Sequence, residues 1–154
     1  MKFEGALYAV RSIAVSRKFY EEIMGRKVAM DLGANLVFEG GPTLQEGFGG
    51  LAGFPGEKTV YRAYNGELYF ETTTLDEDAA RIKAAGTEVL HEIREYPWGQ
   101  RVFRFFDPDG PIIEVGEAMD FVVGRFLAGG MSAEDTAAKT TFPLETIKMI
   151  QANL

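Results

Sequence analysis

The side chains that most often act as nucleophiles or bind metals are scarce in this chain. Its 154 residues include no cysteine and a single histidine, His91. Without cysteine there can be no disulfide, thiolate metal site or cysteine nucleophile, and one histidine cannot form a two-histidine metal site within one chain. Metal or acid–base chemistry would therefore depend on oxygen donors, of which the 23 Asp and Glu side chains are the main source.

The charge balance limits the classes of partner. Sixteen Lys and Arg residues against 23 Asp and Glu residues give a net charge of −7 and a pI near 4.8. A surface of this sign repels phosphate backbones, so we expect no nucleic-acid partner. No apolar run approaches the roughly 18 residues of a membrane span, and residues 1–10 lack the basic and then apolar build of a signal peptide. We therefore expect a cytoplasmic protein without a membrane partner.

Hydrophobic periodicity and turn residues predict two similar runs of elements and a helical tail. The first run has strands at residues 3–11, 26–31, 35–39 and 42–46 and a helix at 14–24. The second has strands at residues 67–72, 87–93, 100–106 and 111–116 and a helix at 76–85. Helices follow at residues 121–128, 133–139 and 144–153. Between the runs, residues 47–56 hold five glycines and one proline, which indicates a loop, linker or lid.

The two runs are copies of one unit. A shift of 61 residues aligns Gly5-Ala-Leu-Tyr8 with Gly66-Glu-Leu-Tyr69, and a shift of 69 aligns Gly41-Pro42 with Gly110-Pro111. Each copy is a βαβββ unit, and one such unit cannot bury both faces of its sheet, so we expect the two to pack together. The predicted boundaries are a first module at residues 1–46, a linker at 47–65, a second module at 66–117 and a tail at 118–154.

Four motifs in this duplicated frame carry a family resemblance. They are Ser16-Arg-Lys-Phe-Tyr-Glu-Glu-Ile-Met-Gly25, Glu67-Leu-Tyr-Phe-Glu71, Pro97-Trp-Gly-Gln-Arg101 and Asp107-Pro-Asp-Gly-Pro-Ile-Ile-Glu114. With them the chain resembles the vicinal oxygen chelate superfamily of glyoxalase I, bleomycin-resistance proteins and extradiol dioxygenases. The resemblance covers residues 4–117 and implies an α+β fold, in which two βαβββ modules form a curled mixed sheet around a cup. It also implies a homodimer, and the helical tail predicted above lies outside the resemblance as a C-terminal extension.

The resemblance also implies a site. Metal-dependent members take one ligand from the first strand and one from the last strand of each module. Mapped through the repeat, these positions hold Gln45, Glu67 and Glu114, with no ligand at Gly5 or Ala6. The three oxygen donors are candidate metal ligands, and Glu67 and Glu114 are also candidate catalytic residues. The implied metal is divalent, with Mg²⁺, Mn²⁺ or Ni²⁺ favoured over zinc or iron, or there is none.

Two carboxylates that face each other need compensation, and three arrangements supply it. A hard cation binds them, an arginine pairs with one of them, with Arg101 as the first choice, or one glutamate stays protonated and acts as an acid or base. Strand alternation favours a shared face, because Glu67 and Tyr69 point the same way.

Further residues are candidates for binding a substrate. They are Tyr8, Tyr69, Trp98 and Arg101. The alternatives are core tyrosines for the first two, a cup-sealing or dimer-contact aromatic for Trp98 and a surface arginine for Arg101. His91 lies at none of the mapped positions, and we expect it to face solvent.

Two function classes remain open. The first is a divalent-metal-dependent lyase or isomerase that acts on a small oxygen-rich or thiol-adduct substrate in the cup. The second is a non-catalytic binding protein of the resistance type, which sequesters a planar or charged small molecule without a metal. Dioxygenase chemistry is less expected, since the iron members present two histidines. We expect the tail to cover the domain or a dimer partner rather than to bind DNA.

Overall fold

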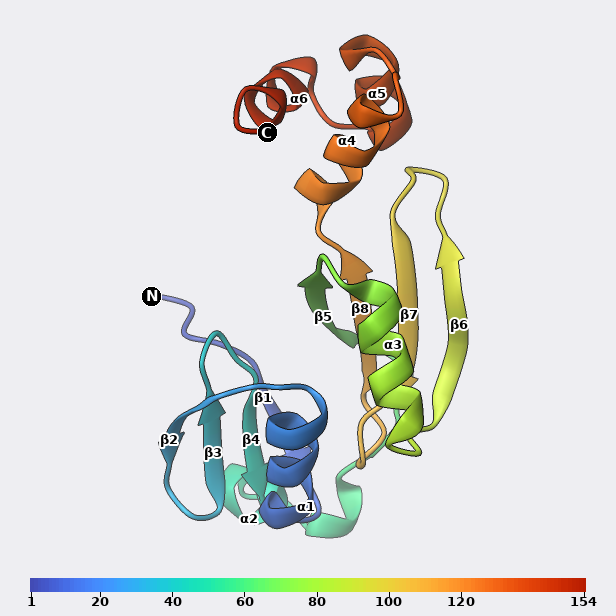
Figure 1. Cartoon of the computed structure of the whole chain (residues 1–154). Helices are drawn as coiled ribbons and strands as arrows, with labels where there is room; N and C mark the ends of the chain where they lie inside the picture. The colour runs from blue at the N-terminus through green and yellow to red at the C-terminus, as the bar shows by residue number, and fades with distance from the viewer.

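The two predicted modules are present in the computed structural model, which describes residues 1–154 (Figure 1). The first module comprises β1 (Leu7–Val10), α1 (Ile13–Lys18), the π-helical turn η1 (Phe19–Ile23), β2 (Val28–Asp31), β3 (Asn35–Phe38) and β4 (Thr43–Glu46). The second comprises β5 (Glu67–Thr72), α3 (Leu75–Ala84), β6 (Val89–Glu95), β7 (Arg101–Phe106) and β8 (Ile112–Glu117). The α+β class is confirmed.

Each module forms its own four-stranded mixed sheet. The strand orders are β1-β4-β3-β2 and β5-β8-β7-β6, so the first strand of each module pairs in parallel with its last strand. The remaining pairs are antiparallel. The two sheets lie next to each other, with α1 and α3 on the same side of them (Figure 1).

The linker is more ordered than its glycine content suggests. It contains the short helix α2 (Phe48–Ala52) and a 3₁₀ turn, η2 (Gly56–Lys58). Gly47 and Gly53 flank α2 in the left-handed conformation that glycine adopts at little cost. The rings of Phe48 and Phe54 pack edge to face with centroids 5.6 Å apart, and this apolar contact holds the residue after α2 against the start of the helix.

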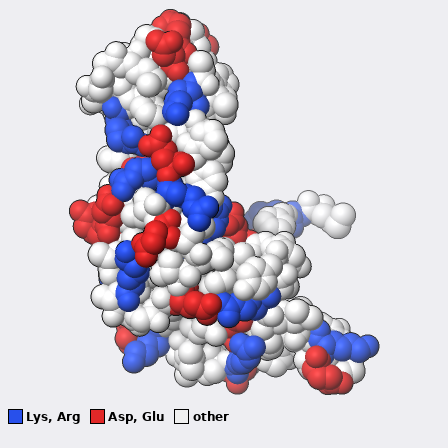
Figure 2. Space-filling model, turned by 90° about the vertical axis from the view of Figure 1, so that its right-hand side faces the viewer, with Lys and Arg blue, Asp and Glu red and all other residues white.

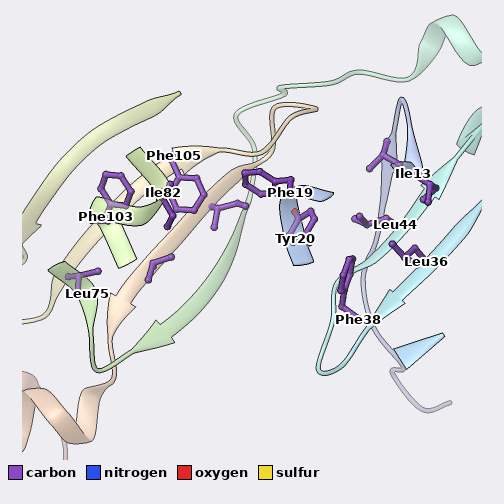
Figure 3. Close-up of a cluster of buried hydrophobic side chains, with 14 residues drawn as sticks. Ile13, Phe19, Tyr20, Leu36, Phe38, Leu44, Leu75, Ile82, Phe103 and Phe105 are labelled. Carbon is purple, nitrogen blue, oxygen red and sulfur yellow. The ribbon is translucent and has the colours of Figure 1, made fainter. Parts of the chain in front are cut away.

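One apolar core joins the modules. Leu36, Phe38 and Leu44 of the first sheet and Phe103 and Phe105 of the second belong to a single buried cluster. Figure 3 shows side chains of η1 lying between those of the two sheets. Burial of these apolar faces under α1 and α3 is the main stabilising contribution to each module.

Polar contacts reinforce the same junction. The turn Asp107–Gly110 connects β7 to β8, and its acidic side chains bind the first module. Asp109 Oδ1 accepts from Arg11 at 3.1 Å, and Asp107 Oδ2 accepts from the hydroxyl of Tyr20 at 3.0 Å. Both aspartates are buried, so these bonds also compensate for the loss of water around the carboxylates.

Three helices form a tail at one end of the second sheet. They are α4 (Met119–Ala128), α5 (Ala133–Thr140) and α6 (Leu144–Gln151), and they pack on one another around Val122, Val123 and Ile147. Figure 1 shows the tail beyond the β6–β7 hairpin rather than over either sheet. Arg125 attaches it by donating to the carbonyl of Gly99 at 2.8 Å and to Glu117 at 3.0 Å.

The surface charge and the helix lengths bear on the expectation that neither nucleic acid nor a membrane is a partner. On the face drawn in Figure 2, Lys and Arg side chains are intermixed with Asp and Glu side chains and form no extended basic patch. None of the helices is both long and apolar enough to cross a bilayer.

The attachment of the tail gives a first prediction. Gly99 has a φ of +88°, and a Cβ there would lie 2.3 Å from Cζ of Phe126. We expect Gly99→Ala to lower the free energy of unfolding by about 2 kcal/mol and to loosen the tail, because the Phe126 ring must move. Gly130→Ala is the matched control, since Gly130 has the same φ of +88° but open space around it. Equal thermal stability and equal proteolysis of the tail in both variants would contradict this expectation.

Candidate functional site

One face of the second sheet carries a group of polar side chains and is not covered by a helix. We call it the open face; it lies opposite α3. Tyr69 of β5, Glu114 of β8 and Arg104 of β7 lie in one row across the sheet. His91 of β6 extends the row as the partner of Arg104, and Glu67 precedes Tyr69 by two residues on the same face. The predicted shared face of Glu67, Tyr69 and Glu114 is therefore present.

Arg104 is the centre of this face. Its Nε donates to Glu67 Oε2 at 2.7 Å, and one terminal nitrogen donates to Glu67 Oε1 at 3.3 Å and contacts Glu114 Oε2. The other terminal nitrogen donates to His91 Nε2 at 3.2 Å and to the hydroxyl of Tyr96. Four of the five N–H donors of the guanidinium thus make hydrogen bonds, and the fifth faces the Glu114 carboxylate in an ion pair. We call these five residues the Arg104 cluster.

The arginine that compensates the carboxylates is Arg104, which corrects the expected pairing with Arg101. Arg101 stands three positions earlier on β7, and alternation places the two side chains on opposite faces. Arg101 binds both carboxylate oxygens of Asp76 on α3, at 2.7 and 3.0 Å, and also contacts Glu117. Hydrogen bonding within this pair lowers the pKa of Asp76 and raises the pKa of Arg101. The substrate role of Arg101 stays a prediction, from a position outside the Arg104 cluster.

A second hydrogen-bonded group adjoins the Arg104 cluster. The hydroxyl of Tyr69 donates to Glu71 at 2.8 Å and accepts from Gln100 Nε2 at 2.8 Å. Burial, followed by the bond to Glu71, raises the pKa of Tyr69 to about 12. Trp98 donates from Nε1 to Gln100 at 3.0 Å and stacks on Tyr96, with centroids 4.8 Å apart and an interplanar angle of 23°. The stacked Tyr96–Trp98 pair therefore borders the carboxylates.

Gln45 lies in the first sheet and has no hydrogen bond to the Arg104 cluster. Its Oε1 accepts from Asn35 Nδ2 at 3.0 Å, and its Nε2 donates to the carbonyl of Glu46 at 2.7 Å. Both ends of the amide are engaged within the first module, so the structure does not bring Gln45 together with the two glutamates.

Tyr8 differs from Tyr69 because the register of β1 departs from the sequence repeat by one residue. Ala9 lies opposite Gln45, whereas Tyr69 lies opposite Glu114. A slip of one residue moves a side chain to the other face of the sheet. Tyr8 accordingly packs against the apolar core instead of lying on the face that corresponds to the open face.

The residues present do not fit a divalent metal as they are arranged. In the true register the counterpart of Glu67 is Leu7, which lies opposite Thr43 and supplies no ligand. Glu67 and Glu114 are bridged by Arg104, and no group of three or more His, Asp or Glu side chains is close enough to hold a metal ion. A metal would therefore have to displace the guanidinium.

Three members of the Arg104 cluster, which are His91, Tyr96 and Arg104 itself, were missed by the sequence reasoning. His91 was expected to face solvent, but it is half-buried and contacts Arg104. The pairing of β6 with β7 is irregular on both sides of His91, so alternation along β6 does not predict on which face of the sheet this side chain lies. Arg104 could have been found by pairing β7 with β8 in an antiparallel register, since it lies directly opposite Glu114.

Comparisons with known proteins agree with this architecture. A family model described as a glyoxalase-like domain matches residues 3–120, and the tail from residue 121 lies outside the match. A protein of unknown function from Agrobacterium tumefaciens str. C58 is 38% identical with a TM-score of 0.67, covering 77% of this chain and 94% of that one. No curated protein gives a significant match.

Two more distant solved structures show the fold alone. One is a glyoxalase/bleomycin resistance protein/dioxygenase from Nocardioides, at 20% identity and a TM-score of 0.59, covering 76% of this chain and 83% of that one. The other is the fosfomycin resistance protein FosX from Listeria monocytogenes, at 21% identity and a TM-score of 0.57, covering 77% and 93%.

Proposed function

The chain belongs to the glyoxalase-like domain family, and we propose that it binds a planar, positively charged small molecule on the open face of the second sheet. The family includes metal-dependent enzymes and resistance proteins. The proposal selects the second of these classes: binding without a metal and without chemical conversion. It rests on the state of Arg104 and on the charges and aromatic rings around it.

The observation that carries the proposal is that the guanidinium of Arg104 has no N–H donor left for a ligand. Because four of its five N–H donors are hydrogen-bonded within the Arg104 cluster and the fifth faces the carboxylate of Glu114, none remains for an anionic ligand. Glu67, Glu71 and Glu114 outnumber this one guanidinium, so the surface around it has an excess of negative charge. Such a surface attracts cations.

The Tyr96–Trp98 pair supplies the apolar part of the binding surface. Trp98 is 36% exposed although it stacks on Tyr96, so part of its indole faces solvent. An indole ring binds planar cations through stacking and cation–π attraction. Tyr96 belongs to the Arg104 cluster, and Trp98 is linked to Glu71 through Gln100 and Tyr69, so the aromatic pair and the carboxylates belong to one hydrogen-bonded group.

Fluorescence of the single tryptophan tests the proposal. Titration with a planar cationic dye such as acridine orange is expected to quench Trp98 saturably, whereas an anionic planar dye is not. Glu71→Gln should weaken binding of the cationic dye about 5- to 10-fold, and Trp98→Ala, followed by dye fluorescence, about 10-fold or more. Glu134→Gln on the tail is the control and should bind as the wild type does. Equal binding of both dyes, or no effect of Glu71→Gln, would overturn the proposal.

A second candidate is the divalent-metal-dependent lyase or isomerase, and one atom favours it. Glu114 Oε2 is buried and makes no hydrogen bond of normal geometry, although it touches the Arg104 guanidinium. In this candidate a divalent ion would have to displace the Arg104 guanidinium, and Glu67 and Glu114 would then hold an ion that supplies Lewis-acid chemistry. Isothermal titration calorimetry of the wild-type protein with Mn²⁺ decides between the two candidates: binding of one ion supports the lyase or isomerase, and no binding supports the metal-free protein.

A further inference from the structure

The turn between β6 and β7, residues 96–100, carries Trp98 and is held from two sides. We propose that the tail is a positioning element of the planar-cation surface: Arg125 of α4 fixes this turn and thereby sets where the indole of Trp98 stands. The inference rests on the cation binding proposed above and adds to it the residue that positions the aromatic ring. Its first readout needs no ligand, so the two proposals can fail separately.

The tail contacts the backbone of the turn directly. Gly99, the residue after Trp98, is buried, and its carbonyl accepts from a terminal nitrogen of Arg125 at 2.8 Å. A Cβ at Gly99 would lie 2.3 Å from Cζ and 2.5 Å from Cε2 of Phe126, so this ring lies against the main chain of the turn. One polar and one apolar contact from α4 therefore fix the residue next to the indole.

The same terminal nitrogen of Arg125 binds Glu117 at the end of β8. Glu117 is 2% exposed, and its Oε2 accepts from Arg125 at 3.0 Å and from the backbone N–H of Arg101 at 3.0 Å. A buried carboxylate needs such donors because it has lost its water. Arg101 directly follows the turn, so Arg125 holds the turn at Gly99 and, through Glu117, at the start of β7.

Gln100 connects the held backbone to the indole. Its Nε2 donates to the carbonyl of Glu117 at 2.8 Å and to the hydroxyl of Tyr69, and its Oε1 accepts from Trp98 Nε1 at 3.0 Å. A Cβ at Gly116 would lie 2.8 Å from Gln100 Nε2, so the glycine makes room for the amide against β8. With both ends of the amide bound, the orientation of the indole depends on where residues 99 and 100 are held.

The rest of the fold does not supply this support. The turn lies beyond Val102 and Gly116, the last paired residues of β7 and β8 at this end, and two strands alone hold a hairpin weakly. The glyoxalase-like match ends at residue 120, so Arg125 lies outside it. A ring that is already ordered binds a stacking ligand more tightly, because the ligand does not bear the cost of ordering it.

Trp98 reports on its own position, because it is the only tryptophan. The first test measures its emission maximum and its quenching by acrylamide in the ligand-free protein. We expect Arg125→Met to increase the quenching and to move the emission to longer wavelength, because the turn loses its bonds to α4. Lys148→Met is the matched control: it also removes a cation from the tail, but Lys148 pairs with Glu145 on α6 and should leave Trp98 unchanged.

The second test measures acridine orange binding by the fluorescence of the dye. Arg125→Met should weaken binding about 5-fold, within the range for substitutions that act on a site without touching its ligand. The direction is decisive, since loss of a positive charge beside an acidic surface would by itself strengthen the binding of a cation. Arg125→Lys keeps the charge and one bond, so it should bind more tightly than Arg125→Met, and Lys148→Met should bind as the wild type does.

The third test uses the wild type alone, because coupling between two sites is reciprocal. A dye that stacks on Trp98 must stabilise the contact between the turn and α4. Hydrogen exchange in residues 119–128 should therefore slow when the dye is saturating, whereas exchange in α1 of the first module should not change.

A folded Arg125→Met protein with unchanged Trp98 quenching, or with equal or tighter dye binding, would overturn the inference. If Arg125→Met does not fold, the wild type decides: slower exchange in α4 supports the inference, and slower exchange confined to the second sheet contradicts it. If the wild type binds no dye, the proposed function is wrong, and Trp98 quenching in Arg125→Met or Arg125→Lys still decides whether the tail positions the ring. If the wild type binds the dye and Trp98 does not respond to Arg125, cation binding stands without the tail.

Discussion

Replacement of Phe105 by alanine is expected to lower the free energy of unfolding by about 3 to 5 kcal/mol, the range for a large aromatic side chain lost from a core. Phe105 is 0% exposed on β7. Its ring packs against Phe103 of the same strand at 5.4 Å and against Phe19 of η1 at 6.4 Å, measured between centroids. The cavity would therefore open where the two modules share their core.

Urea unfolding followed by two probes measures this effect. Trp98 fluorescence reports on the second module, and far-ultraviolet circular dichroism reports on the whole chain. We expect one transition in both signals, shifted to lower urea in Phe105→Ala. Phe3→Ala is the control, because Phe3 is 85% exposed, and it should change stability by less than about 0.5 kcal/mol. A loss below about 1 kcal/mol, or transitions that separate in the wild type, would show that the modules do not depend on a common core.

The order of elements could be predicted because each element carries a local signal. Alternation marks β5, short apolar-rich runs between turn residues mark β7 and β8, and helical periodicity followed by Gly86 marks α3 and its end. The repeat between the modules then predicts that each forms the same kind of sheet. Information of this kind lies within about ten neighbouring residues and does not depend on tertiary contacts. The α2 helix was not predicted, since its glycines suggest a loop and contact between Phe48 and Phe54 overrides them.

Only those features of the candidate site that depend on the sequence of a single strand could be predicted. Alternation along β5 places Glu67 beside Tyr69, but the choice between Arg101 and Arg104 depends on the register between β7 and β8. The same limit explains Tyr8, whose face is set by a register that differs by one residue from the repeat. Register is a property of paired strands, and a slip of one residue reverses the face of every side chain.

The second large effect concerns pH and Asp107, which lies at the junction of the modules. Asp107 is 5% exposed. Its Oδ2 accepts from Tyr20, and its Oδ1 accepts from the backbone N–H groups of Asp109 and Gly110 at 2.8 Å each. Burial is the largest influence and raises the pKa of Asp107 to about 6, although these hydrogen bonds lower it. The neutral acid is therefore favoured in the folded protein more than in the unfolded chain.

The direction of the pH effect follows from proton linkage. A carboxyl group whose pKa is raised by folding binds its proton more tightly in the folded state. Its contribution to stability is fully present below the pKa of about 4 in the unfolded chain and is lost as pH rises through about 6. The difference between these two values corresponds to about 3 kcal/mol in the free energy of unfolding at neutral pH.

Asp107→Asn should remove this dependence, because asparagine keeps an acceptor for the two backbone N–H groups and carries no charge. Urea unfolding at a series of pH values from 3.5 to 8 is expected to show a stability that falls between about pH 4 and pH 6 in the wild type and falls less in the variant, with a difference of up to about 3 kcal/mol at pH 7. Asp76→Asn is the control. Its pKa is lowered by Arg101, so its contribution is lost only at acidic pH, and the region from pH 5 to 7 should not change. An Asp107→Asn profile parallel to the wild type would show that another group causes the pH dependence, and that the negative charge of Asp107 is tolerated where the modules meet.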